Sequence, residues 1–101
     1  MNDYEIIQKL KRREEDGLRD LMKQYSGYVA AIVCNISQGI LSVEDVEELS
    51  ADVFLSVWNH AAGLMEDRPL RPYLAQAARN TAISRLRKRG EAALPFDDDI
   101  I

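Results

Sequence analysis

The sequence predicts an all-α fold, a compact bundle of four helices. Apolar residues recur at intervals of three and four through most of the chain, which is the spacing of one helix face. No stretch shows the strict alternation of apolar and polar residues that a half-buried strand needs. A turn around Gly39 and a proline-bounded loop at 63–71 separate periodic segments. The 101 residues, 47% of them hydrophobic, are enough for one domain with one modest core.

The first two expected helices cover residues 3–12 and 15–37, with a polar break at 13–16 between them. The apolar face of the first helix carries Tyr4, Ile7 and Leu10. The second helix keeps its apolar spacing over its whole length but contains Gly27, which weakens a helix slightly. A glycine at such a position also permits close helix packing, and we expect this role for Gly27.

The third expected helix begins after Ser42 and runs to about residue 62. Ser42 is a preferred N-cap residue, and Asp45 three positions later gives a variant of the capping box. The inner face of this helix carries Val46, Leu49, Val53, Phe54, Val57 and Ala61. A second apolar row, which we call the Trp58 stripe, consists of Ala51, Leu55, Trp58 and Ala62.

Two interpretations of the Trp58 stripe are open at this point. Either the first and fourth helices cover it, or it is a partner-binding surface with Trp58 as its anchor. Acidic residues surround the stripe and favour a basic partner; they are Glu44, Glu47, Glu48 and Asp52. The same negative charge argues against this face as a nucleic-acid site.

The fourth expected helix, at residues 72–89, has two different faces. A broad apolar arc carries Leu74, Ala77, Ala78, Thr81, Ala82 and Leu86. A narrow row opposite, which we call the polar stripe, carries Tyr73, Gln76, Asn80, Ser84 and Arg87. These side chains are an aromatic ring, two amides, a hydroxyl and a guanidinium, which stack on bases, bond base edges and pair with phosphate. The polar stripe therefore indicates a nucleic-acid site.

Charge is distributed unevenly along the chain, whose net charge is −4. The segment 68–90 has seven basic residues and no acidic residue, whereas residues 1–67 have six basic and thirteen acidic ones. A basic segment in an acidic protein is typical of a polyanion site, and it adds Arg68, Arg71 and Lys88 to the DNA-binding candidates. The simpler interpretation is a solvated helix whose basic end interacts favourably with the helix dipole.

Several classes of protein are excluded or disfavoured by composition. With Cys34 and His60 each alone of its kind, the chain can form no internal disulfide, cysteine metal cluster or two-histidine site. No nucleophile–base pair is evident, so we expect neither an enzyme nor a cofactor. Cys34 lies among apolar residues and is expected to be buried. No apolar run is long enough to cross a membrane and no secretion signal is present, so we expect a cytoplasmic protein.

Two segments together resemble a known family. VEDVEELSADVFLSVW, residues 43–58, resembles the core-polymerase-binding segment of bacterial sigma factors, where the usual pattern is roughly DAEDLVQEVFLRLW. LRPYLAQAARNTAISRLRKR, residues 70–89, resembles their promoter-melting and −10-recognition helix, usually roughly FRAWLYRIARNLAIDRLRRR. The order and spacing match over about residues 3–90, as in region 2 of the extracytoplasmic-function sigma factors. Two long motifs in register are a specific signal.

The resemblance implies two binding surfaces. The third helix would dock on the clamp helices of the largest subunit of core RNA polymerase, through the positions of Glu48, Ala51, Asp52, Leu55 and Trp58. The fourth helix and the loop before it would bind the non-template strand of the promoter −10 element. Asn80 matches the family asparagine beside a flipped base, which would lie between the loop and the polar stripe. An anti-sigma factor is a further candidate partner.

Four departures from the family pattern bear on this assignment. Alanine replaces a common glutamine at Ala51, and serine replaces a common aspartate at Ser84. Leucine replaces phenylalanine at Leu70, and arginine replaces glycine at Arg13. These departures bear on polymerase affinity and promoter preference rather than on the fold. We expect residues 1–90 to form the region 2 domain and residues 91–101 to be an acidic linker or tail leading to a missing −35-binding domain.

Two other functions remain alternatives. A generic DNA-binding module such as a helix-turn-helix would need a turn of three to four residues between its helices, and the loop 63–71 is longer. A helical protein-interaction domain would leave the basic helix merely solvated. Preference for single strands over duplex would separate the sigma factor from the first alternative, and absence of nucleic-acid and polymerase binding would favour the second.

Overall fold

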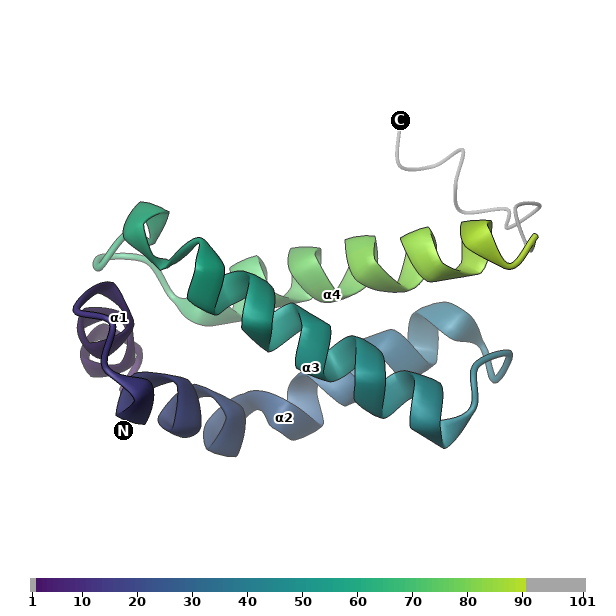
Figure 1. The fold of residues 1–101 in the computed structure, drawn as a ribbon, viewed down its shortest axis with the longest axis horizontal. Helices are drawn as coiled ribbons and strands as arrows, with labels where there is room; N and C mark the ends of the chain where they lie inside the picture. Colours follow the sequence, from purple (N-terminus) through teal and green to yellow (C-terminus); the bar gives the residue numbers. More distant parts are fainter. Residues whose placement is uncertain (1, 91–101) are drawn as a thin grey trace.

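The computed structural model describes residues 2–90 and contains four α-helices in that range, with no strand among the residues described. The elements are α1 (Asp3–Lys11), α2 (Glu15–Ser37), α3 (Val43–Asn59), the 3₁₀ turn η1 (Ala61–Gly63) and α4 (Leu70–Lys88). The long helices α2, α3 and α4 lie together, and α1 crosses one end of them, where Figure 1 shows it almost end-on. The predicted all-α bundle is confirmed. The expected linker at 91–101 lies outside the described residues.

The core lies where α2 meets each of the other three helices. Leu10 of α1, Leu21 of α2, Val53 of α3 and Leu74 of α4 are each fully buried. Each of these side chains removes apolar surface from water, which is the main favourable contribution to folding. The bundle therefore has a continuous buried core, and the other faces of α3 and α4 are exposed.

The helix ends follow from local hydrogen bonding. The predicted capping box is present at α3, where the Ser42 hydroxyl accepts from the Asp45 N–H at 3.0 Å and the Asp45 carboxylate accepts from the Ser42 N–H at 3.2 Å. The same helix ends at residue 59, three residues earlier than predicted, because His60 leaves the helical backbone conformation and η1 follows. The start of α4 lies two residues before the predicted proline, which still falls in the first turn, where its missing N–H costs nothing.

Two residues expected in the core lie on the surface. Cys34 is exposed, because it follows the buried Val33 and is turned about 100° away from the row that α2 buries. Tyr4 is 50% exposed, and Ile6 takes its place on the buried face of α1. Cys34 shows that an apolar neighbourhood in sequence does not fix which residues point inward. Tyr4 shows that helical spacing alone does not fix which of two adjacent rows is buried.

The close helix contact that we expected at Gly27 occurs instead at Gly17. A Cβ on Gly17 would lie 2.8 Å from the Cβ of Lys9 and 2.9 Å from the backbone nitrogen of Leu10, so α1 and α2 touch there. A Cβ on Gly27 would meet nothing within 4 Å. Gly17 is required by packing, whereas Gly27 is an exposed glycine inside a helix.

This difference predicts opposite effects of one substitution. Gly27→Ala should stabilise the fold by about 0.5–1 kcal/mol, because alanine lowers the entropy cost of forming the helix. Gly17→Ala adds the same methyl group but should destabilise the fold, because the methyl overlaps α1. Urea unfolding of both variants and the parent chain measures the two changes. A loss of stability in Gly27→Ala would contradict the prediction.

Candidate nucleic-acid and partner interfaces

The two faces of α4 are confirmed by burial. The apolar arc is in the core, with Leu74, Ala78, Ala82 and Leu86 all fully buried. Every residue of the polar stripe is exposed, and even the aromatic Tyr73 is 39% exposed. An exposed tyrosine in line with amides and a guanidinium is available for stacking on a base.

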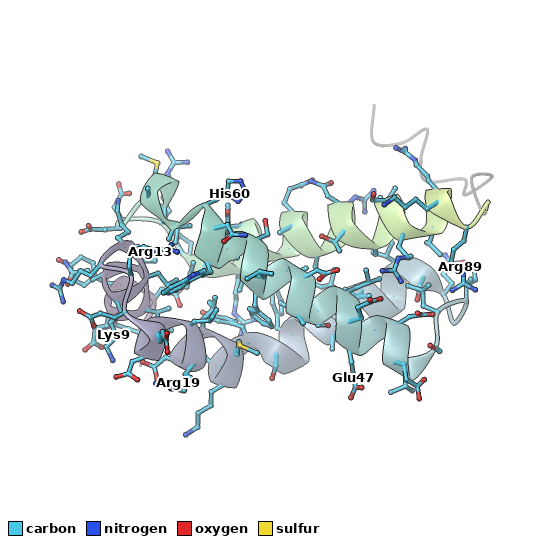
Figure 2. All side chains as sticks on the ribbon, in the orientation of Figure 1. Lys9, Arg13, Arg19, Glu47, His60 and Arg89 are labelled. Carbon is cyan, nitrogen blue, oxygen red and sulfur yellow. The ribbon has the colours of Figure 1, made fainter. Side chains whose placement is uncertain are left out.

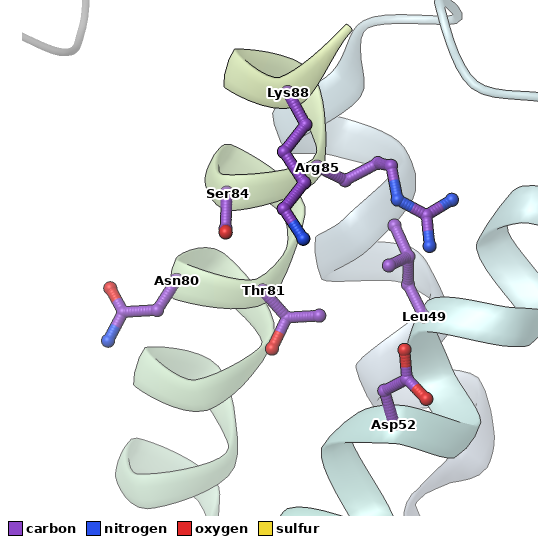
Figure 3. A pocket seen from close by; sticks show the side chains of 7 residues that line it. All are labelled: Leu49, Asp52, Asn80, Thr81, Ser84, Arg85 and Lys88. Carbon is purple, nitrogen blue, oxygen red and sulfur yellow. The ribbon is translucent and has the colours of Figure 1, made fainter.

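The amides of the polar stripe are paired with each other. The Gln76 Nε2 donates to the Asn80 Oδ1 at 3.0 Å, one helical turn away. This bond uses one of the two lone pairs of the Asn80 carbonyl and orients its NH₂ group as a donor. In Figure 3, the Asn80 side chain points away from α3, whereas Thr81 and Arg85 point toward it.

A pocket lies where the loop after η1 meets the start of α4, and we call it the loop pocket. Its volume is about 510 Å³, and its lining is mostly apolar. It includes Met65 and Arg68 of the loop, Tyr73 of α4 and Ile7 of α1. This is the place at which we expected a flipped base. The loop and α4 form its walls as expected, and α1 adds Ile7.

The loop pocket does not extend to Asn80, however. Asn80 shares a separate hollow of about 270 Å³ with Tyr73, Gln76 and Ser56. Tyr73 borders both hollows because it lies at the loop end of the polar stripe. A base between the loop and the polar stripe would therefore meet Tyr73, whereas Asn80 faces other hollows along the stripe.

The basic residues near the loop differ in their surroundings. Arg68 is exposed and lines the loop pocket. The Arg71 guanidinium lies 4.6 Å from the Tyr28 ring and 5.6 Å from the Tyr25 ring, so cation–π contacts hold it against α2. Arg71 remains exposed but is fixed in position, as a preorganised phosphate contact would need to be.

At the other end of α4, Arg87 and Lys88 are exposed, and two neighbouring arginines form ion pairs with α3. Arg85 lies 2.8 Å from a Glu48 oxygen and 3.6 Å from Asp45, and Arg89 lies 3.1 Å from Asp45. Sequence reasoning missed these pairs, because they join residues about forty positions apart. They place Glu48, a predicted polymerase contact, beside the basic end of α4.

The ion pairs and the helix cap also shift two pKa values. Hydrogen bonds from Ser42 lower the pKa of Asp45, and Arg89 and Arg85 lower it further. The hydrogen bond to Glu48 raises the pKa of Arg85. Both shifts favour the charged forms of Asp45 and Arg85, which lie in the seam between α3 and α4. Figure 3 shows the groove of about 430 Å³ beside it, bordered by Asp52 and Lys88.

The Trp58 stripe is largely exposed, so the interpretation that other helices cover it is wrong. Ala51 and Ala62 are exposed, and Leu55 is 53% exposed. The acidic residue Asp52 is exposed beside them. Trp58 itself is half-buried and packs against the core.

Arg13 covers part of the Trp58 ring. Its guanidinium lies 4.0 Å from the ring centroid and donates a hydrogen bond to the Trp58 carbonyl, and Figure 2 shows Arg13 between α1 and the end of α3. The backbone of Arg13 has φ +63°, a left-handed conformation that favours glycine. The arginine that stands at a common glycine position of the family thus occupies a conformation suited to glycine.

Within residues 2–90, no group of three or more His, Cys, Asp or Glu side chains could hold a metal ion. None of the helices described is both long and apolar enough to cross a membrane.

The comparison with family models decides the identity of the fold. The sigma-70 region 2 model matches residues 21–92, which is most of the chain. The chain belongs to the sigma-70 region 2 family. This sigma factor domain has the four-helix architecture and the motif order that the resemblance implied. A comparison with curated proteins gave no match.

A solved structure has the same fold as this sigma region 2 domain. It is the NMR structure of an engineered region 2 of sigmaE in complex with GTAAAA. The TM-score is 0.79 at 19% sequence identity, over 93% of this chain and 96% of the other. At this identity the likeness concerns the fold.

Proposed function

We propose that this sigma region 2 domain docks on the clamp helices of core RNA polymerase through α3 and captures non-template bases of the promoter −10 element on α4. The extracytoplasmic-function class, cytoplasmic location and absence of catalysis belong to the same proposal. The observation that supports it best is the exposed polar stripe, which runs from the loop pocket to the basic end of α4. The relative bound to GTAAAA has the same fold.

Two different surfaces support the two proposed binding roles, DNA binding on α4 and polymerase binding on α3. On α4, the loop pocket and Tyr73 offer apolar and aromatic surface to an unstacked base. Removing a base from a duplex costs a few kcal/mol, and stacking with hydrogen bonding in a pocket offsets that cost. On α3, the Trp58 stripe offers exposed apolar surface with acidic neighbours to a basic helical partner. Melting by this route is a binding process that needs no catalytic side chain.

Two binding measurements on the intact chain test the proposal. Core polymerase should be retained by the immobilised chain, and single-stranded DNA should bind more tightly than duplex of the same sequence. Stronger binding to duplex would favour a generic DNA-binding module. Absence of both polymerase and DNA binding would favour a protein-interaction domain and contradict the proposal.

The basic end of α4 should make binding salt-dependent. On a logarithmic plot of affinity against salt concentration, the slope for single strands is roughly −0.7 per neutralised phosphate. Arg87→Ala should make the slope shallower by about that amount and weaken binding to most sequences alike. The matched control is Arg19→Ala, because Arg19 lies on α2 away from α4 (Figure 2). An unchanged slope in Arg87→Ala would show that Arg87 does not contact a phosphate.

A further inference from the structure

The loop that forms the loop pocket is attached to α1 at its first end. The Lys11 ammonium group, at the end of α1, donates to the Leu64 carbonyl at 2.7 Å. Leu64 follows η1 directly, is buried and lines the pocket. A charged donor on a partly buried carbonyl is a stronger restraint than a neutral hydrogen bond. The bond therefore fixes the point at which the chain enters the loop.

The second end of the loop is attached to the same helix. The Asp3 Oδ2 accepts from the Leu70 N–H at 2.8 Å, and the Asp3 Oδ1 accepts from the Tyr25 hydroxyl. Leu70 is the first residue of α4, where the N–H groups have no partner within the helix. The carboxylate thus satisfies one of these groups and fixes the point at which the loop becomes α4.

A third residue of α1 forms part of the pocket itself. Ile7 is 1% exposed and contributes to the pocket wall between the two attachment points. Asp3, Ile7 and Lys11 are spaced by four residues, so they form a single row along α1. One face of one helix therefore meets the start, the pocket wall and the end of the same loop.

We infer that this α1 row, Asp3–Ile7–Lys11, positions the loop pocket and so helps determine which base the pocket accepts. The inference rests on the proposed function, because it concerns the base-capturing role of that pocket. Neither polar residue of the row lines the pocket, so both are positioning residues. Their effect should appear as selectivity for one base rather than as binding strength in general.

The test compares base preferences of the parent chain and variants of the row. NMR titration with single-stranded DNA hexanucleotides that differ by one base, starting from GTAAAA, gives a Kd for each sequence. Lys11→Met keeps an unbranched apolar stem but removes the donor, and Lys11→Arg keeps a donor. Asp3→Asn keeps one acceptor oxygen but loses the other. Lys23→Met, on an exposed site of α2, is the control for the loss of one positive charge.

We expect Lys11→Met and Asp3→Asn to reduce the Kd ratio between bases at one position roughly two- to tenfold. This is less than the full effect of losing one charge-assisted hydrogen bond, because both residues act through the loop rather than on the base. The other positions should keep their ratios, and backbone signals of the loop should shift. Lys11→Arg and Lys23→Met should match the parent chain. If Lys11→Met weakens all hexanucleotides equally, or keeps every ratio, the inference is overturned. A parent chain without preference at any position would refute the base-capturing function itself.

Discussion

Trp58→Ala should weaken binding of the polymerase clamp helices by about 2 kcal/mol or more, the effect expected for an aromatic anchor at the centre of an interface. Trp58 lies among exposed Ala51, Leu55 and Ala62, so its ring belongs to an apolar row that a partner helix could contact. Isothermal titration of the chain with a clamp-helix peptide hairpin measures the change. Equal affinity of the folded variant and the parent chain would show that the docking face lies elsewhere.

Trp58 also packs against the core, so its truncation affects folding as well as docking. Leu55→Ala separates the two effects, because Leu55 is mostly exposed and contributes little to the core. It should reduce polymerase affinity while leaving thermal stability nearly unchanged. Met22→Ala is the matched control, an exposed apolar side chain on α2 rather than on the stripe. If Met22→Ala lost affinity and Leu55→Ala did not, the polymerase interface would have to be assigned to α2.

Arg13 influences the same surface. Its guanidinium stacks on Trp58 and would meet any partner that packs on this ring. Part of the anchor is therefore already desolvated before docking, which lowers the additional area that Trp58 can bury on binding. Sequence comparison identified Arg13 as a departure from the family glycine, but only the structure relates that departure to Trp58.

Periodicity was sufficient to predict the helices and most of the core, because a spacing of three and four specifies a helix face regardless of its partners. It was insufficient wherever the answer depended on a contact between helices. Gly17, rather than Gly27, lies at a close contact because α1 crosses α2 at that point. Cys34 has apolar neighbours in sequence, yet α2 turns it outward.

The same distinction applies to the candidate site: features of a single helix were predictable, and contacts between helices were not. The polar stripe was predictable because it is a property of one helix. The pairing of Arg85 and Arg89 with Asp45 was not, because it depends on how α3 and α4 lie side by side. The loop pocket was expected between the loop and α4, but the contribution of α1 was not, since no sequence pattern relates residues 3–11 to residues 64–70.

Asn80→Ala should relax base preference at one −10 position by about 1–3 kcal/mol of discrimination, with a smaller effect on overall affinity. Asn80 is exposed on the polar stripe, and its carbonyl accepts a hydrogen bond from Gln76 at 3.0 Å, which orients the amide. The NH₂ group can then donate to an acceptor on a base edge, such as a purine N7 or a thymine O4. A guanidinium on phosphate, as expected for Arg87, would distinguish no base.

Gln76→Ala separates base reading by Asn80 from a merely structural role. It removes the donor that orients the Asn80 amide but leaves Asn80 in place, so the preference at the same position should weaken without disappearing. Promoter-library transcription with holoenzyme containing each variant measures preference position by position. Asn80→Ala could instead lower transcription uniformly across all −10 sequences, with no position losing its base preference. In that case Asn80 only braces the surface of α4, and base reading must be assigned to Tyr73 and the loop pocket.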